Sequence, residues 1–293
     1  MITVGASEAI HCAMAALLDP GDEVLLFNLT YSLYAPIARQ LGAAPVFVDL
    51  SKNFRLDLDR LRSAVTPRTR MIALNNPANP TGVVFTKAEL EGMADVAQKE
   101  SLVVLADEGY DNLVFGGEFT STSQLEALAD RLVYLNSFSK TYAMTGWRLG
   151  WLAAPEAILR GCEIAHRNCV TGVHWPTQRA GLAAIRSHEE VIPAMFDGYN
   201  LRRELIIERL RGTPGVDVRL PQGTFLLFVG FHLGQAFTSS DLGANLLENG
   251  VAVRSGTEYG SAGEGYLWLC YSVELREIGF GAERLHRVFE YLA

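Results

Sequence analysis

Short apolar runs alternate with amphipathic stretches from the start of the chain to about Ala154. The runs at 70–74, 102–106 and 132–135 have the length and composition of buried strands. Between the first two, residues 86–100 show the spacing of an amphipathic helix. Strands and helices that alternate in this way predict an α/β fold, with a mostly parallel central sheet and helices on both faces.

The pattern changes at about His188, where a long charged amphipathic helix is predicted over 189–211. Strand-like segments follow, and a closing helix is predicted over 274–292. The strand-like segments lie at 216–220, 225–229, 251–253 and 267–270. We therefore expect a large domain over 1–187 and a smaller C-terminal α+β domain over 188–293, bridged by the long helix.

Composition narrows the class of protein. A chain of 293 residues with 49% hydrophobic content can bury a sizeable core. A net charge of -8 and the lack of a basic stripe argue against a nucleic-acid or anionic-membrane binder. The sequence has no apolar stretch long enough for a transmembrane helix and no signal-peptide pattern at its start, so we expect a cytoplasmic enzyme.

The cysteines give no sign of a metal site. Cys12, Cys162, Cys169 and Cys270 show no C-x-x-C spacing and no evident partnership with the scattered histidines. We expect reduced thiols and no bound metal.

Lys140 is the first candidate for chemistry. It lies three residues after Ser137 and eight residues before Arg148, in a segment that follows the run at 132–135. A lysine amine can form a Schiff base with an aldehyde, and a serine and an arginine can hold a phosphate. Pyridoxal 5'-phosphate (PLP) carries both groups. A solvated surface loop is the common alternative for such residues.

Three further polar residues follow predicted strands. Asn79 lies in the loop after 70–74, and Asp107 and Tyr110 follow the run at 102–106. Ligands of open α/β sheets bind outside the carboxyl ends of the strands. We therefore expect these side chains to meet Lys140 at one edge of the sheet.

Four segments in this order and spacing resemble the class I/II aminotransferases, the aspartate-aminotransferase-like PLP enzymes of fold type I. They are GASEA at 5–9, PANPTG at 77–82, DEGY at 107–110 and the segment 137–150. The resemblance covers essentially the whole chain. It implies a homodimeric enzyme that transfers an amino group between an amino acid or amine and a 2-oxo acid.

The resemblance also implies roles for single residues. Lys140 would form the Schiff base and move the α-proton of the substrate. Asp107 would keep the pyridine nitrogen protonated, and Tyr110 and Asn79 would hydrogen-bond the 3-oxygen of the ring. Ser137 and Arg148 would hold the phosphate.

Two further cofactor contacts are expected near the N-terminus. Ala6 and Ser7 begin a predicted helix, whose free backbone N–H groups would point at the phosphate. Ser7 as a simple N-cap is the compatible alternative. By resemblance, Tyr31 would stack on the pyridine ring, whereas Tyr34 is expected only to pack.

The sequence departs from the family in two places. The family carries a further N-terminal segment before residues 5–7, which we expect to be missing from the large domain, by truncation or by loss. Trp268 stands where the family has an arginine that binds the substrate α-carboxylate. A tryptophan has one N–H donor and no charge, so it cannot replace that fork.

The departure at Trp268 leaves the substrate open. The substrate lacks an α-carboxylate, or another arginine such as Arg254, Arg276 or Arg179 binds it, or the protein binds PLP without normal transamination. A β-eliminating C–S lyase, an amine-substrate enzyme and a truncated non-catalytic PLP-binding protein therefore stand as alternatives to an aminotransferase.

Overall fold

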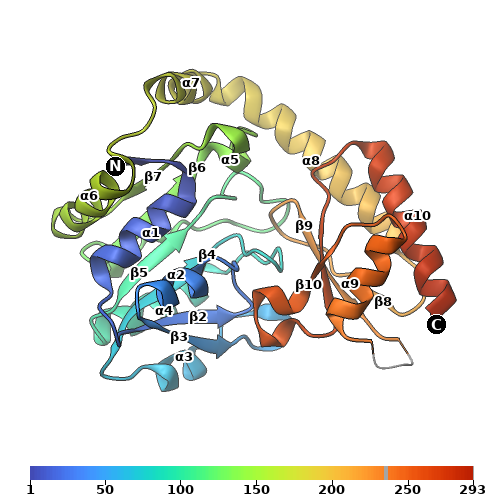
Figure 1. The fold of residues 1–293 in the computed structure, drawn as a ribbon, viewed down its shortest axis with the longest axis horizontal. Coiled ribbons are helices and arrows are strands. Elements are labelled where there is room, and N and C mark those ends of the chain that lie inside the picture. Colours follow the sequence, from blue (N-terminus) through green and yellow to red (C-terminus); the bar gives the residue numbers. More distant parts are fainter. Residues whose placement is uncertain (234–236, 293) are drawn as a thin grey trace.

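The computed structural model describes residues 1–233 and 237–292, which form two sheets with helices packed around them (Figure 1). The larger sheet has seven strands in the order β1-β7-β6-β5-β4-β2-β3. Their bounds are β1 Ile2–Thr3, β2 Glu23–Asn28, β3 Ala44–Asp49, β4 Thr69–Asn75, β5 Val103–Asp107, β6 Leu132–Ser137 and β7 Gly150–Ala153.

The larger sheet is parallel from β3 through β2, β4 and β5 to β6. Only β7 and β1, at one edge, run antiparallel to their neighbours. This arrangement confirms the α/β fold with a mostly parallel sheet. The carboxyl ends of β4, β5 and β6 consequently lie next to one another.

Helices cover both faces of the larger sheet. Along β2, Val24 and Leu26 pack on one face and Leu25 and Phe27 on the other, because successive strand side chains point in opposite directions. The first face is covered by α1 Gly5–Leu17, α2 Tyr34–Gln40 and α6 Glu156–Val170, and the second by α3 Leu58–Ala64 and α4 Lys87–Lys99.

The smaller sheet is antiparallel, with four strands in the order β10-β11-β9-β8. Its strands are β8 Val216–Asp217, β9 Leu226–Phe231, β10 Arg254–Ser255 and β11 Tyr266–Cys270. Three helices pack against it: α8 His188–Leu210, α9 Ser239–Glu248 and α10 Leu275–Leu292. The remaining helices are α5 Phe138–Thr141, α7 Trp175–Arg186 and six short 3-10 turns: Lys52–Phe54, Thr122–Gln124, Glu126–Leu128, Thr145–Trp147, Gly256–Tyr259 and Ser261–Gly263.

The strand expected at 251–253 is wrong. The N–H of Val251 donates to the carbonyl of Leu246 at 2.8 Å, and that of Gly250 to Leu247 at 3.0 Å. These bonds form a Schellman motif that ends α9, with Gly250 at φ +78°. Val251 is therefore buried as part of a helix end, and the strand begins at Arg254. Of the segment 216–220, only Val216–Asp217 pairs with β9.

Helix α8 spans the space between the two sheets. In Figure 1 it runs from α7, beside the larger sheet, to α10 beside the smaller one. The strands of the larger sheet all precede α8, and those of the smaller sheet all follow it. A domain boundary between residues 187 and 188 stays a prediction. None of the helices within 1–233 and 237–292 is long and apolar enough to cross a membrane.

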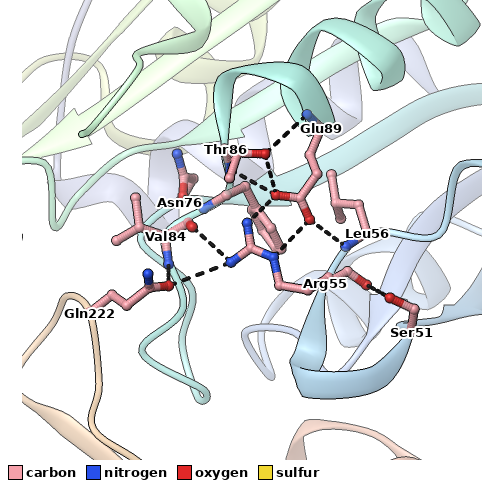
Figure 2. A network of polar contacts seen from close by, with 9 residues as sticks. Ser51, Arg55, Leu56, Asn76, Val84, Thr86, Glu89 and Gln222 are labelled. Atoms are coloured by element: carbon pink, nitrogen blue, oxygen red, sulfur yellow. Dashed lines mark hydrogen bonds and ion pairs between the residues drawn. The ribbon is translucent and has the colours of Figure 1, made fainter. Parts of the chain in front are cut away.

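A polar network fixes the loop that follows β4 (Figure 2). The carboxylate of Glu89 accepts hydrogen bonds from the Arg55 guanidinium, the N–H of Leu56 at 3.0 Å and the N–H of Thr86 at 2.8 Å. Arg55 also donates to the carbonyl of Val84 at 3.0 Å. Thr86 and Glu89 form the capping box of α4. The network therefore holds the end of the segment that carries Asn79.

Glu89→Gln should lower the free energy of unfolding at pH 7 by about 1–2 kcal/mol, because several hydrogen bonds to a charged acceptor are weakened. Burial raises the pKa of Glu89, but the bonds from Arg55, Thr86 and Leu56 together hold it below its ordinary value. The difference from wild type should therefore shrink as the pH falls below about 4. Urea unfolding measures it. Glu91→Gln, on the exposed side of the same helix, is the control, and an equal loss there would contradict this role of Glu89.

Candidate functional site

The expected residues meet in one cavity. It opens where β4, β5 and β6 end, beside the first turn of α1. All nine residues assigned to the cofactor line this cavity, together with four that the sequence did not suggest. The nine are Ala6, Ser7, Tyr31, Asn79, Asp107, Tyr110, Ser137, Lys140 and Arg148, and the four are Asn75, Gly109, Ser139 and Thr145.

One end of the cavity is built for an anion. Helix α1 begins at Gly5, so Ala6 and Ser7 lie in its first turn, where backbone N–H groups have no partner within the helix. Ser7 as an N-cap is wrong, because Val4 holds that position and its N–H donates to Glu8 Oε2 at 2.5 Å. Arg148 brings a full positive charge to the same helix end.

Glycines let Arg148 approach the backbone of this turn. Gly5 has φ +76°, and a Cβ there would overlap the Arg148 guanidinium. A Cβ at Gly150 would lie 2.7 Å from the carbonyl carbon of Gly5 and 2.9 Å from the nitrogen of Ala6. Arg148 is also held by a bond from Nη1 to the carbonyl of Thr145 at 3.0 Å. Only glycine fits at these two positions.

A buried carboxylate marks another side of the cavity. Asp107 accepts hydrogen bonds from the Tyr34 hydroxyl at 3.1 Å and the N–H of Gly109 at 3.2 Å. Burial raises the pKa of Asp107 to about 6, although both bonds and the charge of Lys140 oppose the rise. Such a carboxylate is suited to a partner that brings a proton or a positive charge.

Tyr34 has more than the packing role expected from the sequence. It is fully buried, and its hydroxyl fixes Asp107. Its ring meets that of Tyr31 edge-on, with centroids 5.7 Å apart. A buried tyrosine usually finds a hydrogen-bond partner. The sequence did not show that this partner is Asp107, because Tyr34 lies on α2 and Asp107 ends β5.

Asn75 is a second residue that sequence reasoning missed. Its Nδ2 donates to the carbonyl of Asp107 at 2.9 Å, and its Oδ1 accepts the N–H of Asn79 at 2.7 Å. One side chain thus sets both the end of β5 and the loop after β4. The signal was present in the sequence, as a polar residue that ends an apolar strand.

Lys140 lies on α5, whose N-cap is Ser137. Its Nζ is 5.5 Å from the centre of the Tyr110 ring and 5.1 Å from that of Phe225. Burial lowers the pKa of Lys140, while Cys270 and Asp107 oppose the change. A lowered pKa leaves more of the amine in the neutral form that attacks a carbonyl carbon.

Trp268 is next to this cavity rather than among the residues that line it. Its indole N–H donates to Asn79 Oδ1 at 3.2 Å. The indole stacks on Tyr259, with ring centroids 6.0 Å apart and planes at 23°. Because Asn79 lines the cavity, Trp268 forms a layer behind it.

The three arginines considered as replacements for a family arginine lie in different places. Arg276 is 72% exposed and pairs with Glu274 and Glu277 on the surface. Arg179 lies over the ring of Trp175 on α7. Arg254 is directly opposite Trp268 in the pairing of β10 with β11. Only Arg254 of these three is next to the cavity wall.

The known proteins that this chain resembles, in sequence and in structure, are aminotransferases. The family model described as "Aminotransferase class I and II" matches residues 1–285. The chain is 33% identical to an aspartate aminotransferase of Sulfurisphaera tokodaii, over 100% of this chain and 75% of that protein. It is 35% identical to aromatic-amino-acid aminotransferase 2 of Thermococcus litoralis, over 99% and 76%. The solved aromatic aminotransferase from Pyrococcus horikoshii superposes with a TM-score of 0.94 at 33% identity, over 99% of this chain and 79% of that one.

Asp107→Asn should stabilise the cofactor-free protein above about pH 6. The folded pKa of about 6 lies above the ordinary value of 3.8, so the wild-type protein loses stability as the pH rises through this window. Above it, the variant should be more stable by up to about 3 kcal/mol, and near pH 4 the two should be alike. Urea unfolding across pH 4–8 measures the difference. A difference that does not vary with pH would contradict the buried charge.

Proposed function

The chain belongs to aminotransferase class I and II, and from this premise we propose how its residues bind PLP and transfer an amino group between an amino acid or amine and a 2-oxo acid. Bound PLP supplies an aldehyde that captures an amine and a ring that accepts electrons when the α-proton leaves. The chain supplies the amine, the carboxylate and the anion site described above.

Lys140 and Asp107 are the residues assigned to the chemical steps. Lys140, half-buried beside the rings of Tyr110 and Phe225, would hold the cofactor covalently and then carry the proton at the substrate α-carbon. Asp107, fixed by Tyr34, would hold the ring nitrogen in its protonated form. A pyridinium partner would also offset the cost of burying the Asp107 charge.

Asn79, Tyr110 and Tyr31 would hold the ring. Asn79 Oδ1 already accepts the indole N–H of Trp268, so its Nδ2 remains to donate to the 3-oxygen. The hydroxyl of Tyr110 would donate to the same oxygen. Tyr31, held edge-on by Tyr34, would cover one face of the ring.

The phosphate would lie at the first turn of α1. Ala6 and Ser7 would donate backbone N–H groups, and the hydroxyls of Ser7 and Ser137 and the guanidinium of Arg148 would donate from their side chains. The close packing of Arg148 on Gly5 supports this assignment, because it brings charge and helix end together.

One observation carries the proposal: a single cavity contains a half-buried amine, a buried carboxylate and, at the first turn of α1 beside Gly5, an anion site. A β-eliminating C–S lyase, an amine-substrate enzyme or a non-catalytic PLP-binding protein would use the same cofactor site. The products formed by the enzyme therefore decide among them.

Lys140→Ala should remove the covalent bond to PLP and slow amino transfer at least about 100-fold, because the residue that moves the proton is lost. Borohydride reduction followed by peptide mass spectrometry locates the adduct, and 2-oxo acid formation measures turnover. The exposed Lys87→Ala is the matched control and should leave both unchanged. A reducible adduct that persists elsewhere in the Lys140 variant would contradict the assignment. Pyruvate and ammonia from cysteine conjugates, without amino transfer, would indicate the lyase.

A homodimer is the proposed assembly. Large apolar side chains are exposed around α6 and α7, including Trp175 at 67% and Ile164 at 64%. Trp147, Leu182 and Ile185 add to this exposed set. Figure 1 shows these two helices at the end of the molecule remote from the smaller sheet. A second copy of the chain would cover these side chains.

The double change Trp175→Glu with Leu182→Glu should convert the dimer to a monomer, because two charges would enter an apolar interface. Light scattering during gel filtration measures the mass. Tyr291→Glu, at an 89% exposed position on α10, is the control. A wild-type monomer that binds PLP tightly would count against the dimer.

We also assign the enzyme to the cytoplasm. All of its cysteines are free in the structure, two of them buried. Free thiols persist in the reducing cytosol.

A further inference from the structure

The cations of the cavity are already committed. An amino acid and a 2-oxo acid both carry a carboxylate, which a site of low polarity binds only beside a cation. Within the described residues, Lys140 and Arg148 are the cations that line the cavity. The proposed function assigns Lys140 to the amine chemistry and Arg148 to the phosphate. A substrate carboxylate therefore needs another cation at the rim.

Arg254 lies on the same face of the smaller sheet as Trp268. It pairs directly with Trp268 across β10 and β11, and side chains of such a pair project to the same side. Trp268 in turn contacts Asn79 through its indole N–H. A single side chain, that of Trp268, thus separates Arg254 from Asn79, which lines the cavity.

Aromatic rings hold the Arg254 guanidinium at the rim. It lies over the ring of Tyr259, 5.8 Å from the centroid, and Tyr259 stacks on Trp268. Its charge also reaches the cavity: burial and Asp107 raise the pKa of Tyr31, and Arg148 and Arg254 act against that rise. This effect on a residue that lines the cavity agrees with the place of Arg254 opposite Trp268 in the strand pairing.

Only part of the Arg254 guanidinium is engaged by Glu258. Nη2 pairs with Glu258 on the turn that follows β10, and the side chain remains 49% exposed. Glu258 fixes one arm of the guanidinium and leaves other N–H groups for a ligand. A carboxylate that enters from solvent would thus find the N–H donors of Arg254 beside the stacked rings of Tyr259 and Trp268.

We propose that Arg254 binds the substrate carboxylate in this enzyme, and that the substrate is an amino acid with one carboxylate and an uncharged, apolar or aromatic side chain. The proposal rests on the proposed function. Tyr31 lines the cavity, and the stacked rings of Trp268 and Tyr259 form the layer behind Asn79, so this side of the site carries aromatic rings and suits an uncharged side chain. In the part of the chain that the structure describes, the cavity lining offers no uncommitted second cation for an acidic one.

The test compares ligands that differ only in the carboxylate. Phenylalanine and 2-phenylethylamine serve as amino donors to the PLP-loaded enzyme, with aspartate as the acidic donor. Calorimetry with 3-phenylpropionate, which has the carboxylate but no amine, measures binding without turnover. Arg254→Gln removes the charge, Arg254→Lys retains it, and Arg276→Gln is a matched surface control.

Arg254→Gln should raise the KM for phenylalanine about 10- to 100-fold and weaken 3-phenylpropionate binding by a similar factor, because a charged hydrogen bond is lost. The kcat for phenylalanine and all constants for 2-phenylethylamine should change little. Arg254→Lys should recover part of the affinity, and Arg276→Gln should match wild type. Aspartate should be a poor donor for the wild-type enzyme.

Three results would overturn the inference. Unchanged phenylalanine and 3-phenylpropionate constants in Arg254→Gln would show that another group binds the carboxylate, while wild-type amino transfer would leave the proposed function intact. Wild-type turnover of 2-phenylethylamine without phenylalanine would mean that no carboxylate is bound. Aspartate turnover as efficient as that of phenylalanine would exclude the substrate class. A wild-type protein that neither binds PLP nor transfers an amino group would reject the proposed function itself.

Discussion

The buried carboxylate of Asp107 is the constraint on which the site depends. A carboxylate at the end of β5 has lost its water, and the hydrogen bonds from Tyr34 and Gly109 compensate only in part, since its pKa stays raised to about 6. The cost is stored in the folded protein until a protonated or cationic partner enters. Under the proposed function, the pyridinium nitrogen of PLP would be such a partner. The fold would then hold a feature that is unfavourable without the cofactor and that the bound cofactor offsets.

Backbone geometry places the other groups around that carboxylate. Parallel strands bring the ends of β4, β5 and β6 to one edge, where Asn75 joins Asp107 to the Asn79 loop. The antiparallel strands β1 and β7 pair with each other at the edge of the sheet. Arg148, just before β7, therefore packs against Gly5 at the N-terminal end of α1. The smaller sheet then closes one side of the site through Trp268. The loops and helices around the larger sheet therefore supply the cavity lining, and the smaller sheet supplies the layer behind it.

Much of this could be predicted from the sequence. The membership in a fold type I aminotransferase family is confirmed by the match over residues 1–285 and by solved relatives at TM-scores above 0.9. The periods of the predicted strands and the spacing of the motifs identified Lys140 and Asp107 as candidates, because both patterns are local in the sequence. Tyr34 was not predicted to bind Asp107, since that contact joins residues separated by 73 positions. The strand expected at 251–253 is wrong because a buried valine after Gly250 fits the end of a helix as well as it fits a strand. The position of Arg254 beside Trp268 likewise required the register of β10 and β11.

A crystal structure of the PLP-loaded protein would show directly whether Asp107 holds the cofactor. We expect the pyridine nitrogen about 3 Å from the Asp107 carboxylate and the phosphate at the N–H groups of Ala6 and Ser7, next to Arg148. Continuous density from the cofactor to Lys140 should complete the picture. A cofactor with its nitrogen turned away from Asp107, or with its phosphate outside the first turn of α1, would contradict it.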